Sequence, residues 1–306
     1  MPRVVAIVDT NFYRGTPDEI VEDLRWLESR AGVKAIASFH ATTELLAHMA
    51  SRTDPSYGVC RAALKRLWRH CAVYSITDSG LPLAADPNGM IAKTIFDRRA
   101  PWGYELAIKT ATLVKRIALD NGEPTPELLS DLTVVRRFRD EAESRFAMML
   151  RDTRRQLGLN KDAASDFAPS HRPTSRNFLE SGVLRHLAAH ALVLNCASEL
   201  RLRLDDRDVA QRASILEPHI PTALRVFESA IEQAVSAGAA PDKCANSLWD
   251  LHLALFAAES MRVEGHPVVV VTDDKPIHRA AAATGASDRV FSLSSYRDFL
   301  LTRVAA

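Results

Sequence analysis

Acidic residues follow two apolar runs that lie near opposite ends of the sequence. Asp9 comes directly after the run Val-Val-Ala-Ile-Val at 4–8, whereas Asp273 and Asp274 follow four consecutive valines and Thr272. Apolar, β-branched runs of this length are typical of buried parallel strands, and ligands of open α/β sheets bind outside the carboxyl ends of such strands. We therefore expect these carboxylates to meet at one edge of a sheet.

Carboxylates gathered without matching cations repel one another, raise one another's pKa and lose solvation. The usual remedy in a protein is a divalent ion held on oxygen ligands, so the sequence predicts a Mg²⁺ or Mn²⁺ site. Two further acids are candidates for it. Glu44 lies in the first turns of an expected helix, and Asp250 lies in a helical stretch that is apolar on nearly every side, where a carboxylate is costly unless exposed or liganded.

Each acid also has a structural alternative. Asp9 could cap a helix, but the next expected helix begins only after Thr16, its expected N-cap. Glu44 could complement a helix dipole or belong to a capping box. Asp250 could face solvent on the far side of its helix. These alternatives stay open from sequence alone.

Polar neighbours of the acids are expected to support them. Thr10 and Asn11 follow Asp9 directly and are candidates for hydrogen bonds that fix its carboxylate. Thr272 is expected to support the backbone or the site in the same way. We expect Asp273 to cap the helix that follows it.

The elements that position these residues follow from hydrophobic periodicity. Strands and helices alternate over 1–52 and again over 241–306, as a parallel sheet covered by helices requires. Strands are expected at 4–8, 33–39, 267–272 and 289–293, and helices at 17–30, from 42, at 241–263, at 276–284 and from 294. We expect both ends of the chain to form one discontinuous α/β domain.

The interval 53–240 has a different pattern, with apolar residues recurring every three or four positions and almost no strand-like alternation. Helices are expected at 60–70, 104–119, 126–157, 178–204 and 209–237, with breaks at 77–89 and 161–177. We therefore expect 53–240 to be a large all-helical insertion in the sheet domain.

Taken together, these residues resemble the PIN-domain nucleases. The motifs that carry the resemblance are Val-Asp-Thr-Asn at 8–11, Ser38 six residues before Glu44-Leu45, Asp250 followed by Leu-x-Leu-Ala-x-x-Ala-Ala, and Thr272-x-Asp274. The resemblance covers only 1–52 and 241–306. The interval between Asp250 and Thr272 is longer than in compact members of the family, and the family pattern does not explain the insertion.

The resemblance implies a PIN-like three-layer fold with a central parallel sheet. It implies that Asp9, Glu44, Asp250 and Asp274 form a catalytic acidic cluster that binds Mg²⁺ or Mn²⁺. The implied activity is endonucleolytic hydrolysis of phosphodiester bonds, with RNA favoured over DNA. The alternative is a PIN-like module with little catalysis that binds nucleic acid or serves in assembly. The toxins of the family also raise the prospect of an inhibitory protein partner.

A nucleic-acid footprint on this chain must be a local patch, because the formal net charge is only +1. The basic residues expected to contact nucleic acid recur every three or four positions on one helix, and they are Arg61, Lys65, Arg66 and Arg69. The alternative is a solvated helix face.

Other classes of site lack their motifs. The sequence has no G-x-G-x-x-G and no P-loop, and its cysteines have neither zinc-site nor disulfide-framework spacing. His186 and His190 lack the glutamate of the zincin pattern, and Asn11 stands where a haloacid-dehalogenase-like phosphatase has its second aspartate. Charged residues interrupt the most apolar stretch, 183–200, so we expect a cytoplasmic protein without a membrane span. A homo-oligomer stays open.

Overall fold

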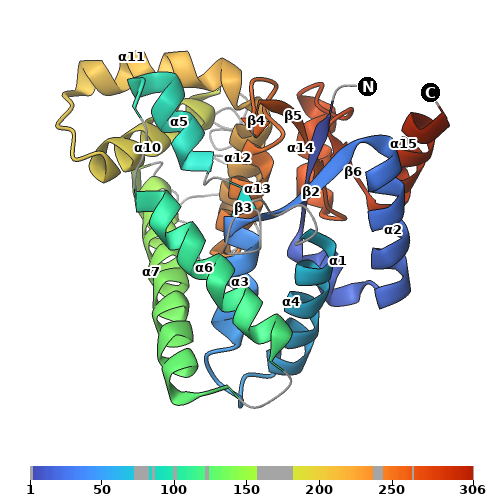
Figure 1. Cartoon of the computed structure of the whole chain (residues 1–306). Helices are drawn as coiled ribbons and strands as arrows, with labels where there is room; N and C mark the ends of the chain where they lie inside the picture. The colour runs from blue at the N-terminus through green and yellow to red at the C-terminus, as the bar shows by residue number, and fades with distance from the viewer. Residues whose placement is uncertain are drawn as a thin grey trace.

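The computed structural model describes residues 3–71, 83–84, 87–98, 102–120, 124–156, 182–236, 244–263 and 265–305. A central sheet lies among helices that cover both of its faces (Figure 1). Its strands are β1 (Val4–Val8), β2 (Val33–Ser38), β3 (Leu83–Ala84), β4 (Arg262–Val263), β5 (His266–Val271) and β6 (Val290–Phe291). The chain is therefore an α/β protein, as expected.

The strands run in the order β3-β2-β1-β5, and β6 pairs with the second half of β5. All of these pairs are parallel, whereas β4 runs antiparallel to the beginning of β5. Val8 at the end of β1 lies opposite Ala37 of β2 and Val271 of β5. The carboxyl ends of β2, β1 and β5 therefore lie side by side at one edge of the sheet.

The helices that precede or follow these strands have the following bounds. They are α1 (Thr10–Gly15), α2 (Asp18–Ala31), α3 (Phe39–His48), α4 (Tyr57–Cys71), α5 (Pro87–Phe96), α6 (Trp102–Leu119), α7 (Pro126–Gln156), α10 (Val183–Glu199), α11 (Asp206–Leu216), η3 (Glu217–His219), α12 (Pro221–Ser236), α13 (Ser247–Leu255), α14 (Lys275–Ala283) and α15 (Leu293–Ala305). Among the helices described, none combines the length and apolarity that a bilayer crossing needs.

Alternate side chains of the strands enter two separate cores, one on each face of the sheet. Val5 and Ile7 join a core built with α5, α7 and α10 to α14. Ala6 and Val8 join a second core built with α1 to α4, α6, α7 and α15. Burying one such aliphatic side chain stabilises the fold by roughly 1.5 to 3 kcal/mol. Helices therefore pack on both faces of the sheet, and this packing fixes the position of the edge that carries the acids.

The interval 53–240 is not all helical, so that expectation is wrong. The short strand β3 lies within it and pairs with the edge of the sheet, with Leu83 opposite Ala37. A strand of two residues has no alternation that periodicity can detect. The other residues of the expected break at 77–89 are partly outside the described residues, and the break at 161–177 lies wholly outside them. The division into a sheet domain and an insertion stays a prediction.

Two expected helices are shorter than their apolar patterns indicate. The helix expected at 209–237 is divided into α11 and α12, because Pro218 and Pro221 interrupt the helical hydrogen bonding. The helix expected at 241–263 is only α13 within the described part of that interval, and the chain then turns into β4. Ala257 and Ala258 continue the apolar spacing and are buried, but they lie beyond the end of α13. The apolar pattern therefore predicts a longer helix than the chain forms.

Candidate metal centre

A pocket of about 260 Å³ lies at the carboxyl edge of the sheet. Its acidic lining residues come from four different elements. Asp9 follows β1, Glu44 lies on α3, Asp250 lies on α13, and Asp274 follows β5. The other described residues that line it are Thr10, Asn11, Arg14, Ser38, His40, Ala41, Asn246, Trp249 and Leu253. The structure thus brings together the four acids that the sequence singled out.

Asp9 caps a helix, contrary to our expectation. The helix α1 begins directly after it, and Asp9 Oδ1 accepts a hydrogen bond of 2.6 Å from the Thr10 backbone N–H. Thr16 ends α1, and Pro17 is the N-cap residue of α2, so the cap expected at Thr16 is wrong too. A helix of six residues spans too few turns to show a helical period in the sequence.

Three side chains also lie within hydrogen-bonding distance of the Asp9 carboxylate. The hydroxyl of Thr10 lies 3.2 Å from Oδ1, and the hydroxyl of Thr272 lies 2.8 Å from Oδ2. Asn11 Nδ2 donates to Oδ2 at 3.5 Å. The Thr272 hydroxyl in turn accepts from the Asp274 backbone N–H at 3.1 Å. These are the neighbours expected to fix Asp9, and Thr272 links it to the segment that follows β5.

Glu44 belongs to an ion pair and not to a capping box. Ser38 caps α3 by accepting from the Ala41 backbone N–H. Glu44 Oε1 instead lies 3.0 Å from Nη2 of Arg14, and its Oε2 accepts from the Thr10 hydroxyl at 3.1 Å. The Thr10 hydroxyl therefore lies between the carboxylates of Asp9 and Glu44.

Asp273 does not cap α14, which corrects our expectation. The N-cap residue of α14 is Asp274, whose side chain makes no capping hydrogen bond. Asp273 instead accepts a hydrogen bond of 3.3 Å from the Leu293 backbone N–H, where α15 begins. The Asp274 carboxyl is thus free to line the pocket, where its charge helps to raise the pKa of Asp250.

Acidic side chains outnumber basic ones in the lining of the pocket. Arg14 is the only lysine or arginine among its described lining residues, against four acids. Burial, opposed by the Thr272 hydrogen bond and reinforced by the charge of Glu44, raises the pKa of Asp9 to about 6. Burial and the charges of Asp274 and Asp9 raise the pKa of Asp250 to about 8. A cation bound among these carboxyls would favour their ionised forms and lower both pKa values.

The donor set fits a hard divalent ion, because carboxylate oxygens dominate it. In their present rotamers, however, no three His, Cys, Asp or Glu side chains of the described residues are arranged to hold a metal ion. Asp9 is occupied by its hydrogen bonds, and Glu44 is occupied by Arg14. Ion binding therefore requires side chains to rotate. The lining acids that are not paired with an arginine in the described part of the chain are Asp9, Asp250 and Asp274.

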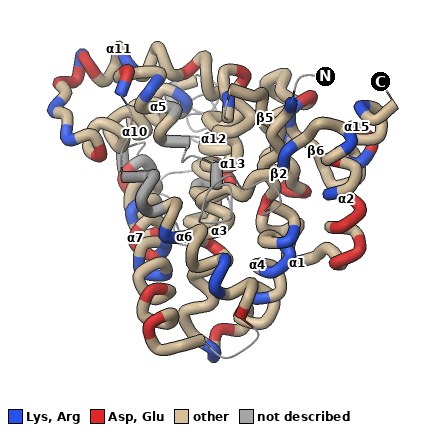
Figure 2. The backbone as a smooth tube through the Cα atoms, in the orientation of Figure 1, with Lys and Arg blue, Asp and Glu red and all other residues tan. Residues whose placement is uncertain are grey.

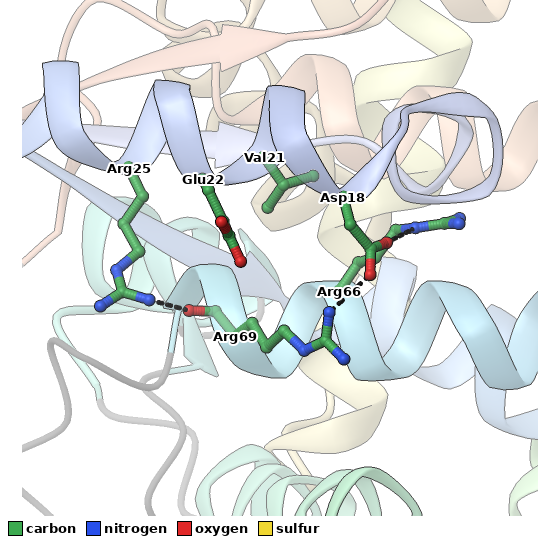
Figure 3. A pocket seen from close by; sticks show the side chains of 6 residues that line it. All are labelled: Asp18, Val21, Glu22, Arg25, Arg66 and Arg69. Carbon is green, nitrogen blue, oxygen red and sulfur yellow. Dashed lines mark hydrogen bonds and ion pairs between the residues drawn. The ribbon is translucent and has the colours of Figure 1, made fainter.

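The basic residues expected to contact nucleic acid do not line this pocket. Along α7, positions of Lys and Arg are interleaved with positions of Asp and Glu (Figure 2). On α4, Arg66 Nε and Arg69 Nη1 both pair with Asp18, at 2.6 and 2.5 Å (Figure 3). Hydrogen bonds from these two arginines lower the pKa of Asp18.

The remaining two residues of that set also have partners within the protein. Arg61 donates a hydrogen bond to the backbone oxygen of Asp120 at 3.4 Å. Lys65 also has a polar or electrostatic interaction within the protein. The cavity beside Arg66 and Arg69 has a volume of about 10 Å³, which suits one water molecule. A nucleic-acid contact for the set Arg61, Lys65, Arg66 and Arg69 stays a prediction.

Sequence reasoning missed several lining residues. Arg14 follows Thr10 by four positions and so lies on the same face of α1, which a correct helix start would have revealed. His40 stacks on His252 with ring centroids 4.0 Å apart. Trp249 packs beside both and donates from Nε1 to Glu143 at 2.8 Å. Of these three residues, His40 and Trp249 line the pocket that holds the acids.

No family model, curated protein or solved structure matches this chain.

Proposed function

We propose that this protein is a divalent-metal-dependent nuclease that hydrolyses phosphodiester bonds, with RNA as the favoured substrate. The observation that carries the proposal is the convergence of Asp9, Glu44, Asp250 and Asp274 on one pocket at the carboxyl edge of a parallel sheet. The PIN-like fold assignment belongs to this proposal and is supported by the position and order of the same acids.

In the proposed reaction, Asp9, Asp250 and Asp274 would hold Mg²⁺ or Mn²⁺. When bound, such an ion polarises a phosphoryl oxygen and lowers the pKa of a coordinated water. Thr10 and Thr272 keep the Asp9 carboxylate in place. Glu44 sits beside Asp9 through the shared Thr10 hydroxyl, where it can orient the attacking water and accept its proton.

Cleavage of a mixed pool of single-stranded RNA and DNA in Mn²⁺ tests the proposal. We expect wild type to cut strands internally and Asp9→Asn to cut neither kind. Asparagine can still accept the Thr10 hydrogen bond that begins α1, so this variant keeps the helix cap and loses the charge.

Asp273→Asn is the matched control, because Asp273 adjoins Asp274 but is not a pocket-lining residue. We expect this control to cut like wild type. If wild type binds nucleic acid and cuts neither strand with any divalent ion, the alternative of a binding or assembly module replaces the enzyme.

A further inference from the structure

Arg14 is a charged residue of the pocket lining to which the proposed chemistry gives no role. It lies near the end of α1, which also carries Thr10 and Asn11 into the pocket. Its Nη2 lies 3.0 Å from Glu44 Oε1 and 3.7 Å from Cys60 Sγ. About a quarter of its side chain is exposed, and the residue lines the pocket. A positively charged arginine opposes the binding of a metal cation nearby, so its presence in this pocket calls for a separate explanation.

The guanidinium has hydrogen-bonding capacity that the described residues do not satisfy. Arg14 Nε is buried and has no hydrogen-bond partner among them. Its contact to Cys60 is long and uses a weak sulfur acceptor. An arginine presents its donors in a planar fork that matches two oxygens of one phosphate group. A ligand with several anionic oxygens is therefore the acceptor that fits.

We propose that Arg14 binds a non-bridging oxygen of the substrate's phosphodiester group and gives up its ion pair with Glu44 as it does so. This inference rests on the proposed function, because it assigns the substrate-binding residue of the same site. The other oxygen of Glu44 stays within hydrogen-bonding distance of the Thr10 hydroxyl, whose single hydrogen is shared with Asp9 Oδ1. The exchange frees Glu44 at the moment when substrate enters.

Electrostatics also favour Arg14 as the residue that binds the substrate's phosphate group. An acidic pocket repels an anionic backbone, and an ion bound to Asp9, Asp250 and Asp274 offsets only part of that charge. The arginines of α4 cannot replace Arg14 at the pocket, because Arg66 and Arg69 are paired with Asp18 and do not line it. Arg14 therefore acts as a positioning residue for the phosphate and not as a metal ligand.

The test is binding of a fluorescein-labelled single-stranded RNA in Ca²⁺, with intact strands verified on a gel, beside Mn²⁺-induced thermal stabilisation. We expect Arg14→Ala to weaken RNA binding roughly tenfold or more, as loss of a charged hydrogen bond does. Arg14→Lys should fall between Arg14→Ala and wild type, since lysine keeps the charge and loses the fork. Arg25→Ala is the matched control: Arg25 is also half-buried, but lies in the small cavity of Figure 3.

The two measurements separate a phosphate contact from a structural role. We expect Mn²⁺ to stabilise Arg14→Ala at least as much as wild type, because removing a nearby cation favours metal binding. RNA binding by Arg14→Ala and Arg14→Lys within about twofold of wild type overturns the inference, as does a wild type that binds no RNA. If RNA binding in Ca²⁺ depends on Arg14 but wild type cleaves no strand in Mn²⁺, the proposed hydrolase is wrong and Arg14 remains a phosphate-binding residue.

Discussion

At the residue scale, the Asp9 carboxylate is subject to opposing effects. Hydrogen bonds from Thr272 and the Thr10 backbone favour its charged form, whereas burial and the charge of Glu44 favour its neutral form. Burial dominates, and the pKa of Asp9 rises to about 6. Burial and the charges of Asp274 and Asp9 raise the pKa of Asp250 to about 8. Both carboxyls therefore take up a proton more readily in the metal-free pocket than in the unfolded chain.

The raised pKa values of Asp9 and Asp250 make the stability of the metal-free protein depend on pH. A carboxyl whose pKa is raised by folding stabilises the fold fully below its unfolded pKa of about 4, and this contribution is lost as pH rises through the folded pKa. Asp9 alone accounts for on the order of 3 kcal/mol. We expect the free energy of unfolding in EDTA to fall between pH 4 and 8, as measured by urea denaturation.

Asp250→Asn is the control for this pH dependence, since asparagine cannot ionise. We expect this variant to lose less stability than wild type over the upper part of that range, where Asp250 titrates. Equal slopes in the two proteins contradict the raised pKa of Asp250.

At the scale of elements, the short helix α1 depends on a buried polar network beneath it. The Tyr13 hydroxyl lies 2.9 Å from His70 Nδ1, and His70 Nε2 lies 2.9 Å from Glu28 Oε2. The Tyr296 hydroxyl donates to the other Glu28 oxygen at 2.7 Å. These four side chains are at most 1% exposed and join α1, α4, α2 and α15. The network therefore fixes the helix that carries Thr10 and Arg14.

Tyr13→Phe tests this anchor. The substitution keeps the ring and leaves His70 Nδ1 without its partner, so we expect a loss of about 1 to 3 kcal/mol in the free energy of unfolding. Urea denaturation measures it, with Tyr57→Phe on the partly buried start of α4 as the control. Equal stability of Tyr13→Phe and wild type would show that the network does not hold α1.

Sequence predicts the elements of this site unevenly. The runs at 4–8 and 267–272 were identifiable as strands because several consecutive β-branched residues are buried on both faces. Their parallel pairing then places Asp9 near Asp274. The start of α1 was missed, and with it the cap at Asp9 and the position of Arg14. The Arg14–Glu44 pair depends on how α1 packs against α3, which no local pattern encodes.

At the scale of the whole molecule, both cores combine residues from the two chain ends with residues of 53–240. Leu184 and Phe227 pack on one face of the sheet, and Leu64 and Leu113 pack on the other. Helices of this interval therefore cover apolar surface that the sheet exposes without them. The long helix α7 contributes to both cores (Figure 1).

This packing predicts that the sheet portion does not fold alone. We expect a chain in which a short linker replaces 53–240 to show no cooperative thermal transition, because both sheet faces lose part of their cover. Differential scanning calorimetry and near-ultraviolet circular dichroism measure this. A cooperative transition in the shortened chain would show instead that 53–240 is dispensable for folding.

Divalent-ion binding by the acidic pocket is the central claim, and thermal unfolding in a Mn²⁺ titration tests it most directly. An ion that binds only the folded state at 100 times its dissociation constant stabilises it by about 2.7 kcal/mol. We predict that Mn²⁺ raises the melting temperature of wild type and of Asp273→Asn, and does not raise that of Asp9→Asn or Asp250→Asn. Equal stabilisation of all four proteins, or of none, contradicts the account.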